Sequence, residues 1–290
     1  MKSKIIIYAA FLLLFFSATV FAQETHLWKV TSKNGKHTSY LYGTMHFFGE
    51  SFYNKYPVLD KSLMSSDMVV TEMEMIRKTA ENYGNPTDEA EKILNKEQLN
   101  LVKEIFKNEK TDFRRFNPSE MAFKLQMKFN AKNCIYLNPS DEYYLDQYIQ
   151  KKGKENNKKM YYLETIDQQI NYLNRADSKA SDSVTWKSAA FGIKVILRQY
   201  NKSKNTCLGL VEKYGSFKIP YEFDKSCENI NDHQAIIRKE RNGKWMKVLP
   251  ELFENNNVFV AVGLGHFHYQ CGLIQELKKL GYSVEPVSMK

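Results

Sequence analysis

The chain has few cysteines and lacks the short catalytic motifs that identify many hydrolases and nucleotide-binding proteins. Its 290 residues include four cysteines, and no two of them have the Cys-x-x-Cys spacing of structural zinc or thiol redox sites. No Gly-x-Ser-x-Gly, phosphate-binding glycine loop or His-Glu-x-x-His occurs. The sequence therefore gives no support to a serine hydrolase with a nucleophile elbow, a P-loop protein or a zincin.

Apolar runs long enough to span a bilayer are also lacking. Lys2 and Lys4 precede an apolar stretch at 5–16, and 20–22 supplies small residues of the kind a signal peptidase reads. We expect residues 1–22 to be an export signal and the mature chain to begin at Gln23, in the periplasm or outside the cell, with no membrane span after cleavage. An uncleaved anchor is the alternative, but the run is shorter than a span of about 20 residues.

Negative charge is in deficit, with 33 Asp and Glu against 42 Lys and Arg and a net charge of +9. The excess lies on lysine-rich helical faces and in the segment 151–159, where no aromatic residues are interleaved to stack on bases. This pattern predicts a solvated basic surface and no nucleic-acid partner.

The cysteine count is even, which predicts one or two disulfides in an oxidising compartment. Three connectivities are possible among Cys134, Cys207, Cys227 and Cys271. The segment between Cys207 and Cys227 is rich in Gly, Pro and aromatic residues, as in a loop that needs a covalent closure. We therefore expect these two to pair.

Strand-like and helix-like segments alternate along the chain. Strands are expected at 27–31, 38–42, 67–74, 160–164, 258–262 and 282–287. Helical spacing is found at 57–66, 88–152, 167–174, 182–200, 231–253 and 270–280. The fold class is α/β: a central mixed, mostly parallel sheet wrapped by helices, with a hairpin at one edge and a helical insertion. We expect residues 23–290 to form a single domain, with the helical middle region at about 85–155.

Two Gly-x-x-His stretches follow strand-like runs, at 43–46 and 263–266. Imidazoles on turns at the carboxyl ends of two strands can meet in one cleft and bind a divalent metal. His46 and His266 are therefore candidate ligands, and a hydrogen-bonded structural histidine is the alternative for each. His268 has the same spacing from Gly265 and would share a face with His266 in an extended segment.

Carboxylates also lie at the carboxyl ends of expected strands, at Glu72, Glu74 and Glu164, and Glu72 and Glu74 share one face if their strand stays extended. A hydrolytic metal site combines neutral imidazoles with one or two carboxylates, and a further carboxylate can activate water. Glu72 and Glu164 are the candidate catalytic carboxylates, and Glu74 is a further candidate for the same role. The alternative for each is a surface charge at the end of a strand. Arg241 is a candidate for a substrate clamp or for stabilising an oxyanion, with an exposed basic helix face as the alternative.

An ordered set of short motifs extends over most of the chain. It consists of Trp28 with 40–46, 67–72, 162–165 with Gln168, Arg241 with Asn242, 259–266, Leu273 and 281–287. With this set, the chain resembles the TraB/GumN family, which is related to the Tiki proteins that antagonise Wnt signalling. Asp141 resembles in position an acidic residue of the family. In the family the segment before that residue usually contains glycine, whereas 138–140 here has none.

The resemblance implies a sheet wrapped by helices, related to that of erythromycin esterases and ChaN-like proteins. Tiki proteins are described as proteases dependent on manganese or cobalt, with both motif histidines and a strand-end glutamate at the active site. Carried over, these become the metal ligands His46, His266 and Glu72. Other relatives are linked to the shutdown of pheromone signalling, so the resemblance constrains the site better than the substrate.

The resulting hypothesis is an exported metal-dependent hydrolase, with a peptidase as the favoured type. Manganese or cobalt is expected from the resemblance, and zinc suits the same donors. The rival hypothesis is a non-catalytic envelope protein that binds or sequesters a peptide or small molecule. The sequence leaves open the substrate, the preferred metal and the oligomeric state.

Overall fold

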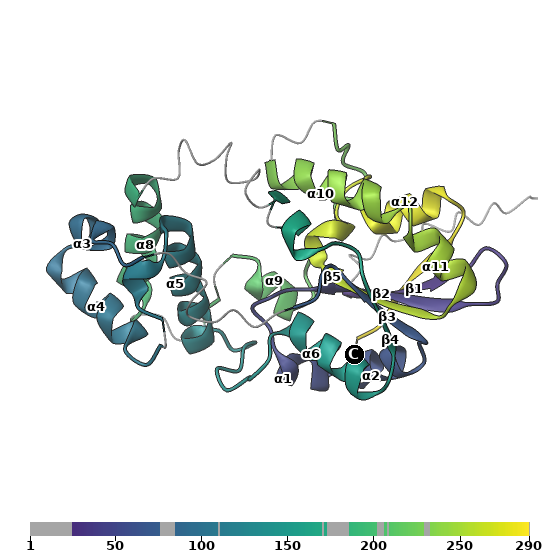
Figure 1. Ribbon diagram of the computed structural model, residues 1–290, viewed down its shortest axis with the longest axis horizontal. Coiled ribbons are helices and arrows are strands. Elements are labelled where there is room, and N and C mark those ends of the chain that lie inside the picture. Colours follow the sequence, from purple (N-terminus) through teal and green to yellow (C-terminus); the bar gives the residue numbers. More distant parts are fainter. Residues whose placement is uncertain are drawn as a thin grey trace, which may run out of the picture.

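A mixed six-stranded sheet forms the centre of the computed structural model (Figure 1). The structure describes residues 25–75, 85–109, 111–169, 171–172, 186–201, 206–207, 209–228 and 233–289. The expected signal segment 1–22 lies outside these residues, as do parts of the expected helices 167–174, 182–200 and 231–253. Within the described part of the chain, no helix combines the length and apolar character needed to cross a bilayer.

The strands run in the spatial order β4-β3-β5-β2-β1-β6. Their bounds are β1 Leu27–Thr31, β2 Thr38–Thr44, β3 Met68–Thr71, β4 Lys159–Tyr162, β5 Val258–Gly263 and β6 Ser283–Val287. The neighbours β4, β3, β5 and β2 are parallel, whereas β1 pairs antiparallel with both β2 and β6. The predicted α/β class with a mostly parallel sheet is confirmed. The predicted edge position of the β1–β2 hairpin is wrong, because β6 adds to β1 and forms that edge.

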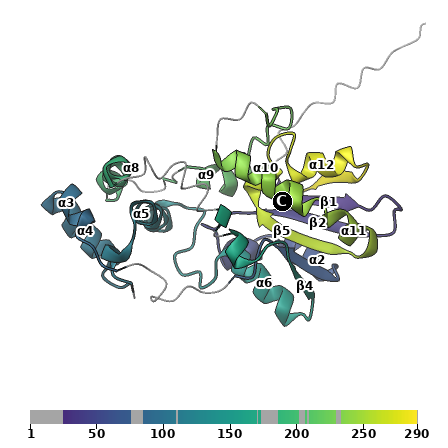
Figure 2. The same ribbon diagram turned by 45° about the horizontal axis from the view of Figure 1, so that its top comes forward.

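Helices cover both faces of the sheet, as Figures 1 and 2 show. One face carries α10 His233–Trp245, α11 Leu249–Asn255 and α12 Leu273–Lys279, and the other carries α1 Glu50–Asn54, α2 Pro57–Met64 and α6 Leu145–Glu155. Strand β5 is therefore covered on both sides, and its residues from Val258 to Val262 are all buried. A continuous apolar run is typical of such a strand.

A second apolar cluster lies to one side of the sheet, among α3 Glu89–Ile93, α4 Lys96–Phe106, α5 Pro118–Asn133 and α8 Trp186–Gln199 (Figure 1). Helix α5 begins at a capping box, in which the Asn117 side chain accepts from the Glu120 amide and the Glu120 carboxylate accepts from the Asn117 amide. The short helix η2 Phe113–Arg115 adds Phe113 to this cluster, whereas α9 Val211–Gly215 packs in the main core. Helix α5 faces the carboxyl edge of the parallel strands, since Phe123 and Met127 lie with His46 and Glu72 around one cavity.

Two disulfides join distant segments, Cys134 to Cys207 and Cys227 to Cys271. The predicted pairing of Cys207 with Cys227 is wrong. Cys134 caps the C-terminus of α5 and brings Cys207 to that helix, whereas Cys227 lies against the loop that follows β5. Composition of the intervening segment could not reveal these long-range neighbours.

Candidate active site

The parallel strands β2, β5 and β3 end at one edge of the sheet and bring three predicted site residues together. Thr44 is the register partner of Gly263, and Thr71 is the partner of Ala261. His46, His266 and Glu72 follow these positions within a few residues. The carboxyl edge of a parallel sheet is where open α/β folds bind ligands.

His46 is oriented by Asp146, from the first turn of α6. The imidazole Nδ1 lies 2.7 Å from Asp146 Oδ2, and the Thr44 hydroxyl donates to Asp146 Oδ1 at 2.5 Å. The Asp146 carboxylate raises the pKa of His46 to about 9. Because Nδ1 is engaged, Nε2 is the nitrogen open to a ligand, and a metal ion would have to displace its proton; the ring is 58% exposed. A carboxylate on one nitrogen is the arrangement that orients a metal-binding histidine.

Glu72 is held between β5 and α10. The Gly263 amide donates to Oε1 at 2.7 Å, Arg241 Nη2 donates to Oε2 at 2.6 Å, and Gln169 donates to the same oxygen at 3.1 Å. Burial on its own would raise the pKa of Glu72, but the Arg241 guanidinium and the Gly263 N–H hold it below its ordinary value. The group therefore stays a carboxylate at neutral pH.

Arg241 connects Glu72, Glu164 and His266. Its Nε and Nη2 donate to both oxygens of the Glu164 carboxylate at 2.9 to 3.1 Å, while its Nη1 lies 3.2 Å from His266 Nε2. Trp245 Nε1 also donates to Glu164, at 2.9 Å. Glu164 is thus a buried anchor for Arg241, and all three guanidinium nitrogens are engaged.

His266 is a neutral imidazole that carries its proton on Nδ1. Arginine can only donate, so His266 Nε2 accepts from Arg241 and the ring proton lies on Nδ1, which donates to Asn242 Oδ1 at 2.6 Å. Burial lowers the pKa of His266 to about 3, against the opposing effect of Glu72. Nε2 of His266 lies 3.7 Å from Glu72 Oε1, so the two groups are neighbours.

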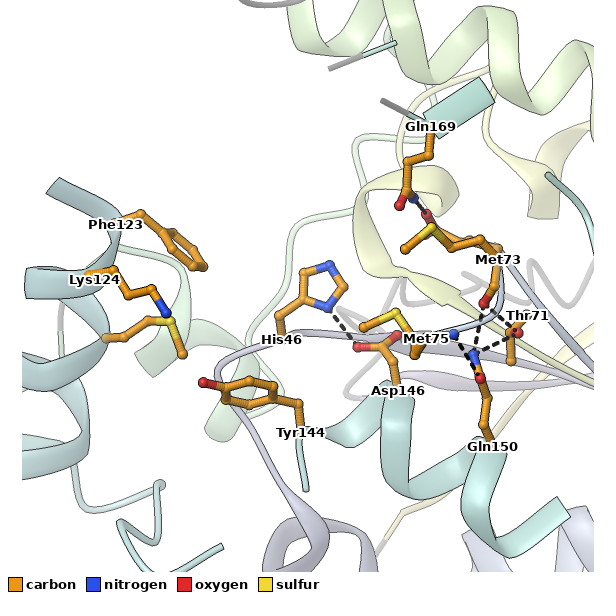
Figure 3. Close-up of a pocket in the computed structure, with 12 residues that line it drawn as sticks. His46, Thr71, Met73, Met75, Phe123, Lys124, Tyr144, Asp146, Gln150 and Gln169 are labelled. Atoms are coloured by element: carbon orange, nitrogen blue, oxygen red, sulfur yellow. Dashed lines mark hydrogen bonds and ion pairs between the residues drawn. The ribbon is translucent and has the colours of Figure 1, made fainter. Parts of the chain in front are cut away.

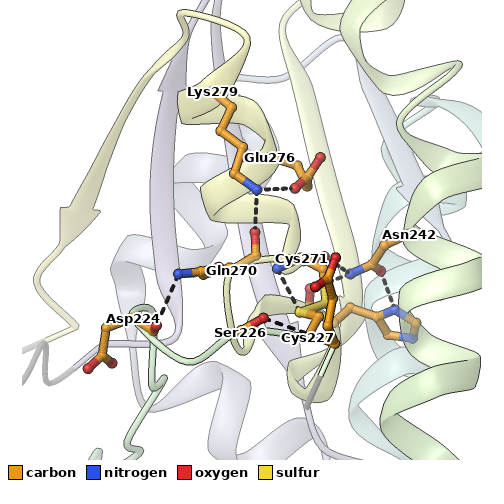
Figure 4. The surroundings of a disulfide bond; sticks show 10 residues. Asp224, Ser226, Cys227, Asn242, Gln270, Cys271, Glu276 and Lys279 are labelled. Carbon is orange, nitrogen blue, oxygen red and sulfur yellow. Dashed lines mark hydrogen bonds and ion pairs between the residues drawn. A yellow bond between two sulfur atoms is a disulfide. The ribbon is translucent and has the colours of Figure 1, made fainter. Parts of the chain in front are cut away.

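The loop that carries His266 is closed by Asn242 and a disulfide (Figure 4). Asn242 Nδ2 donates to the carbonyl oxygens of His266 and Cys271 at 3.0 and 2.9 Å. Cys271 is bonded to Cys227, and its amide donates to Cys227 Sγ at 3.0 Å. Cys271 therefore carries both the disulfide and a carbonyl that bonds to Asn242, the side chain that orients the His266 imidazole.

Removing this disulfide by Cys227→Ser with Cys271→Ser is expected to cost about 2–5 kcal/mol of stability and to increase hydrogen exchange in 264–272. Replacing Cys134 and Cys207 by serine serves as the control, because that bridge lies at α5 and should cost a similar amount without raising exchange in 264–272. Equal exchange in the two variants would show that the Cys227–Cys271 bridge does not hold the loop.

Gly43 permits the two Gly-x-x-His turns to touch. A Cβ atom there would lie 2.5 Å from Leu264 Cδ1, 3.0 Å from the Phe267 ring and 3.2 Å from Leu264 Cα. Positive φ is not the reason, since Gly43 and Gly263 are absent from the residues with positive φ. The glycine is required by close packing against the turn that carries His266.

The variant Gly43→Ala is expected to lower the free energy of unfolding by about 1–3 kcal/mol, because the added methyl overpacks this contact. Urea denaturation measures the loss. Gly243→Ala is the matched control: Gly243 is exposed in α10, its Cβ would meet nothing within 4 Å, and alanine there should add about 0.5–1 kcal/mol. A neutral Gly43→Ala would contradict the close-packing explanation.

A sequence model of the TraB/PrgY/gumN family matches residues 26–286. The chain belongs to the TraB/PrgY/gumN family. No curated protein and no solved structure matches it significantly. The likeness to the erythromycin esterase and ChaN-like fold thus stays a prediction.

Other predicted positions of this TraB/PrgY/gumN chain lie away from the cluster. Strand β3 ends at Thr71, so Glu74 does not share a face with Glu72 but pairs with Lys154 at the surface. Because a 3-10 turn replaces the expected extended segment, His268 packs beside the Tyr221 ring rather than beside His266.

Asp146, Asn242 and Gln169 were not predicted as site residues. Asp141, the acidic position suggested by the family resemblance, instead accepts from the amide and hydroxyl of Ser51. Asp146 lies in the first turn of an amphipathic helix, where acidic residues are common for reasons of helix stability alone. What distinguishes Asp146 is its buried side chain. The burial of a single acidic residue cannot be predicted reliably from the sequence.

A cavity of about 270 Å³ opens beside these groups, between α5 and the sheet edge (Figure 3). His46, Glu72, Asp146, Gln150 and Gln169 supply its polar wall. His266 and Glu164 do not line it. The cavity thus presents one imidazole and two carboxylates, Glu72 and Asp146, to a ligand, while the second imidazole lies next to Glu72 outside the lining.

His46, His266 and Glu72 match a divalent ion in the type of donor that they offer. Two imidazoles and a carboxylate are the ligand types of hydrolytic metal sites. As the side chains stand, however, no group of three His, Cys, Asp or Glu among the described residues is arranged to hold an ion. Arg241 also blocks His266, since its Nη1 occupies the Nε2 lone pair. The donors fit in kind, and ligation by His266 requires Arg241 Nη1 to leave Nε2.

Proposed function

We propose that this protein is an exported hydrolase that uses a divalent metal ion and acts on peptides. The proposal rests mainly on one observation: His46, Glu72 and His266 follow the ends of the three adjacent parallel strands β2, β3 and β5. Manganese or cobalt is proposed from the family resemblance, with zinc also compatible with nitrogen and oxygen donors. Two disulfides agree with an oxidising location.

His46, Glu72 and His266 would hold the ion, which when bound polarises a substrate carbonyl and acidifies water. Asp146 fixes the His46 ring so that Nε2 faces the cavity. Glu164 keeps Arg241 beside Glu72, and Arg241 balances the charge of both carboxylates. Glu72 is the carboxylate placed to order a water molecule, because it lines the cavity and Glu164 does not.

A non-catalytic binder is the second candidate function. The contact of Arg241 with both His266 and Glu72 favours it, because these bonds occupy the donors that an ion would use. A binder would retain a peptide in the same cavity without cleaving it.

Turnover of a peptide library by metal-stripped protein, with and without added Mn²⁺, separates the two candidates. Metal-dependent cleavage is expected, and Glu72→Gln is expected to reduce the rate by at least about 100-fold. Glu74→Gln is the matched control, since Glu74 is an exposed carboxylate two residues away and should leave the rate unchanged. Peptide retention without cleavage under all metal conditions would favour the binder and contradict the hydrolase.

A further inference from the structure

We propose that the cavity beside His46 is a subsite for an apolar side chain of a polypeptide bound in extended conformation. This inference rests on the proposed function, because it assigns the substrate class of the same site. It is carried by the lining of the cavity, by two exposed aromatic side chains at its mouth and by its continuation on both sides.

The apolar wall of the cavity is adaptable: Met73 and Met75 lie beside the polar groups, and Phe123 lies across from them next to Lys124 (Figure 3). Met73 and Met75 follow β3, Met127 and Phe123 project from α5, and Tyr144 precedes α6. Methionine side chains are unbranched and polarisable, so three of them around one cavity can repack against apolar groups of different shape. This wall would accept a variety of apolar side chains, whereas a charged side chain would lose solvation against the methionine and phenylalanine groups.

Two large side chains of this wall are unusually open to solvent. Phe123 is 44% exposed and Tyr144 is 43% exposed, although both belong to residue types that normally bury much of their surface. Single exposed apolar residues need no explanation, but these two border the same cavity as His46 and Glu72. An apolar side chain entering the cavity would cover them and gain the free energy of burial.

The cavity continues into two neighbouring depressions. Met75 and Gln150 also line one of about 440 Å³ together with Tyr143 and Gln147. Met127 and Tyr144 also line another of about 170 Å³.

A bound molecule can therefore extend past the central cavity in two directions. An extended peptide, at about 3.3 Å per residue, matches such a series of adjoining sites. The larger depression also contains Lys151, Lys154 and Glu155, so that side suits polar residues. The smaller one combines Phe47, Phe48 and Leu137 with Lys128 and Asp141, so it offers both apolar and charged groups. A small polar molecule would leave both sides and the methionine wall unused.

Peptide binding in the presence of EDTA tests the subsite without requiring turnover. Fluorescein-labelled decapeptides that differ only at the central residue, with Leu or Met against Asp or Lys, are titrated with full-length mature protein and followed by anisotropy. The apolar peptides are expected to bind at least tenfold more tightly than the charged ones. Phe123→Ser and Met127→Ser should each reduce binding of the Leu peptide about tenfold and remove much of the preference.

Phe191→Ser is the matched control, because Phe191 is 75% exposed on α8 and does not line the cavity. It should bind like the wild type, and circular dichroism checks that all three variants fold. Equal binding of apolar and charged peptides, no binding of any peptide, or unchanged binding by both Phe123→Ser and Met127→Ser would overturn the subsite. Selective binding without metal-dependent cleavage would preserve the subsite and overturn the hydrolase.

Discussion

Replacing Arg241 with methionine is expected to lower the free energy of unfolding by about 3–5 kcal/mol. Arg241 is almost fully buried and bonds to Glu72, Glu164 and His266. Methionine keeps much of the apolar stem but leaves two buried carboxylates without their cation. Breaking a buried ion pair from one side is costly because the remaining charge has lost its solvation and its partner.

The pH dependence of this loss has a defined sign. Carboxylates left without a cation take up protons more readily, so the deficit of Arg241→Met relative to the wild type should shrink as the pH falls from 7 to 4. Denaturation in urea at several pH values measures it. Adding Glu164→Gln to Arg241→Met should recover part of the stability, since it removes one of the unpaired charges.

Lys244→Met on the same helix is the control for Arg241. The Lys244 side chain is exposed and pairs with Glu240, and exposed pairs contribute about 0–1 kcal/mol. If Arg241→Met were no more destabilising than Lys244→Met, or if its deficit grew at low pH, the role of Arg241 as the cation for two buried carboxylates would be wrong.

The variant Asp146→Asn is expected to weaken binding of a divalent metal by 10- to 100-fold. It should also lower the pKa of His46 from about 9 toward the ordinary value near 6.5, because the Asp146 charge is the main cause of the rise. Titration of the His46 ring by NMR measures the pKa, and Mn²⁺ titration measures the affinity. The two readouts separate loss of ring orientation from general unfolding.

Asp141→Asn provides the comparison, because Asp141 bonds to Ser51 and does not contact His46. It should leave the His46 pKa and the metal affinity unchanged. A His46 pKa that stays near 9 in Asp146→Asn, or that falls equally in Asp141→Asn, would contradict the orienting role of Asp146.

The strands and the gathering of polar residues at their ends follow from local sequence patterns. The β5 segment is apolar throughout because it is covered on both faces, and the Asn117 capping box marks the start of α5. Parallel strand ends meet at one edge, so His46, Glu72 and His266 could be expected near one another from topology alone. Each of these inferences depends on short-range spacing or on a general rule of sheet construction.

Features that depend on tertiary packing could not be read in the same way. The partners of the four cysteines, the role of Asp146 and the bond from Asn242 to His266 each join segments far apart in the chain. Arg241 was predicted as a substrate clamp or oxyanion donor, and each of its three guanidinium nitrogens bonds to Glu164, Glu72 or His266. A basic residue on a helix has the same sequence signature whether it faces solvent or two buried carboxylates.

Mn²⁺ and Co²⁺ binding to the purified mature protein, measured by equilibrium dialysis with mass spectrometry, tests the central claim most directly. The account predicts a single ion per chain in the wild type and in His268→Ala, and loss of that ion in His46→Ala, in Glu72→Ala and in His266→Ala. A wild type that binds no ion specifically, or variants that retain it undiminished, would show that these three side chains do not form one metal site.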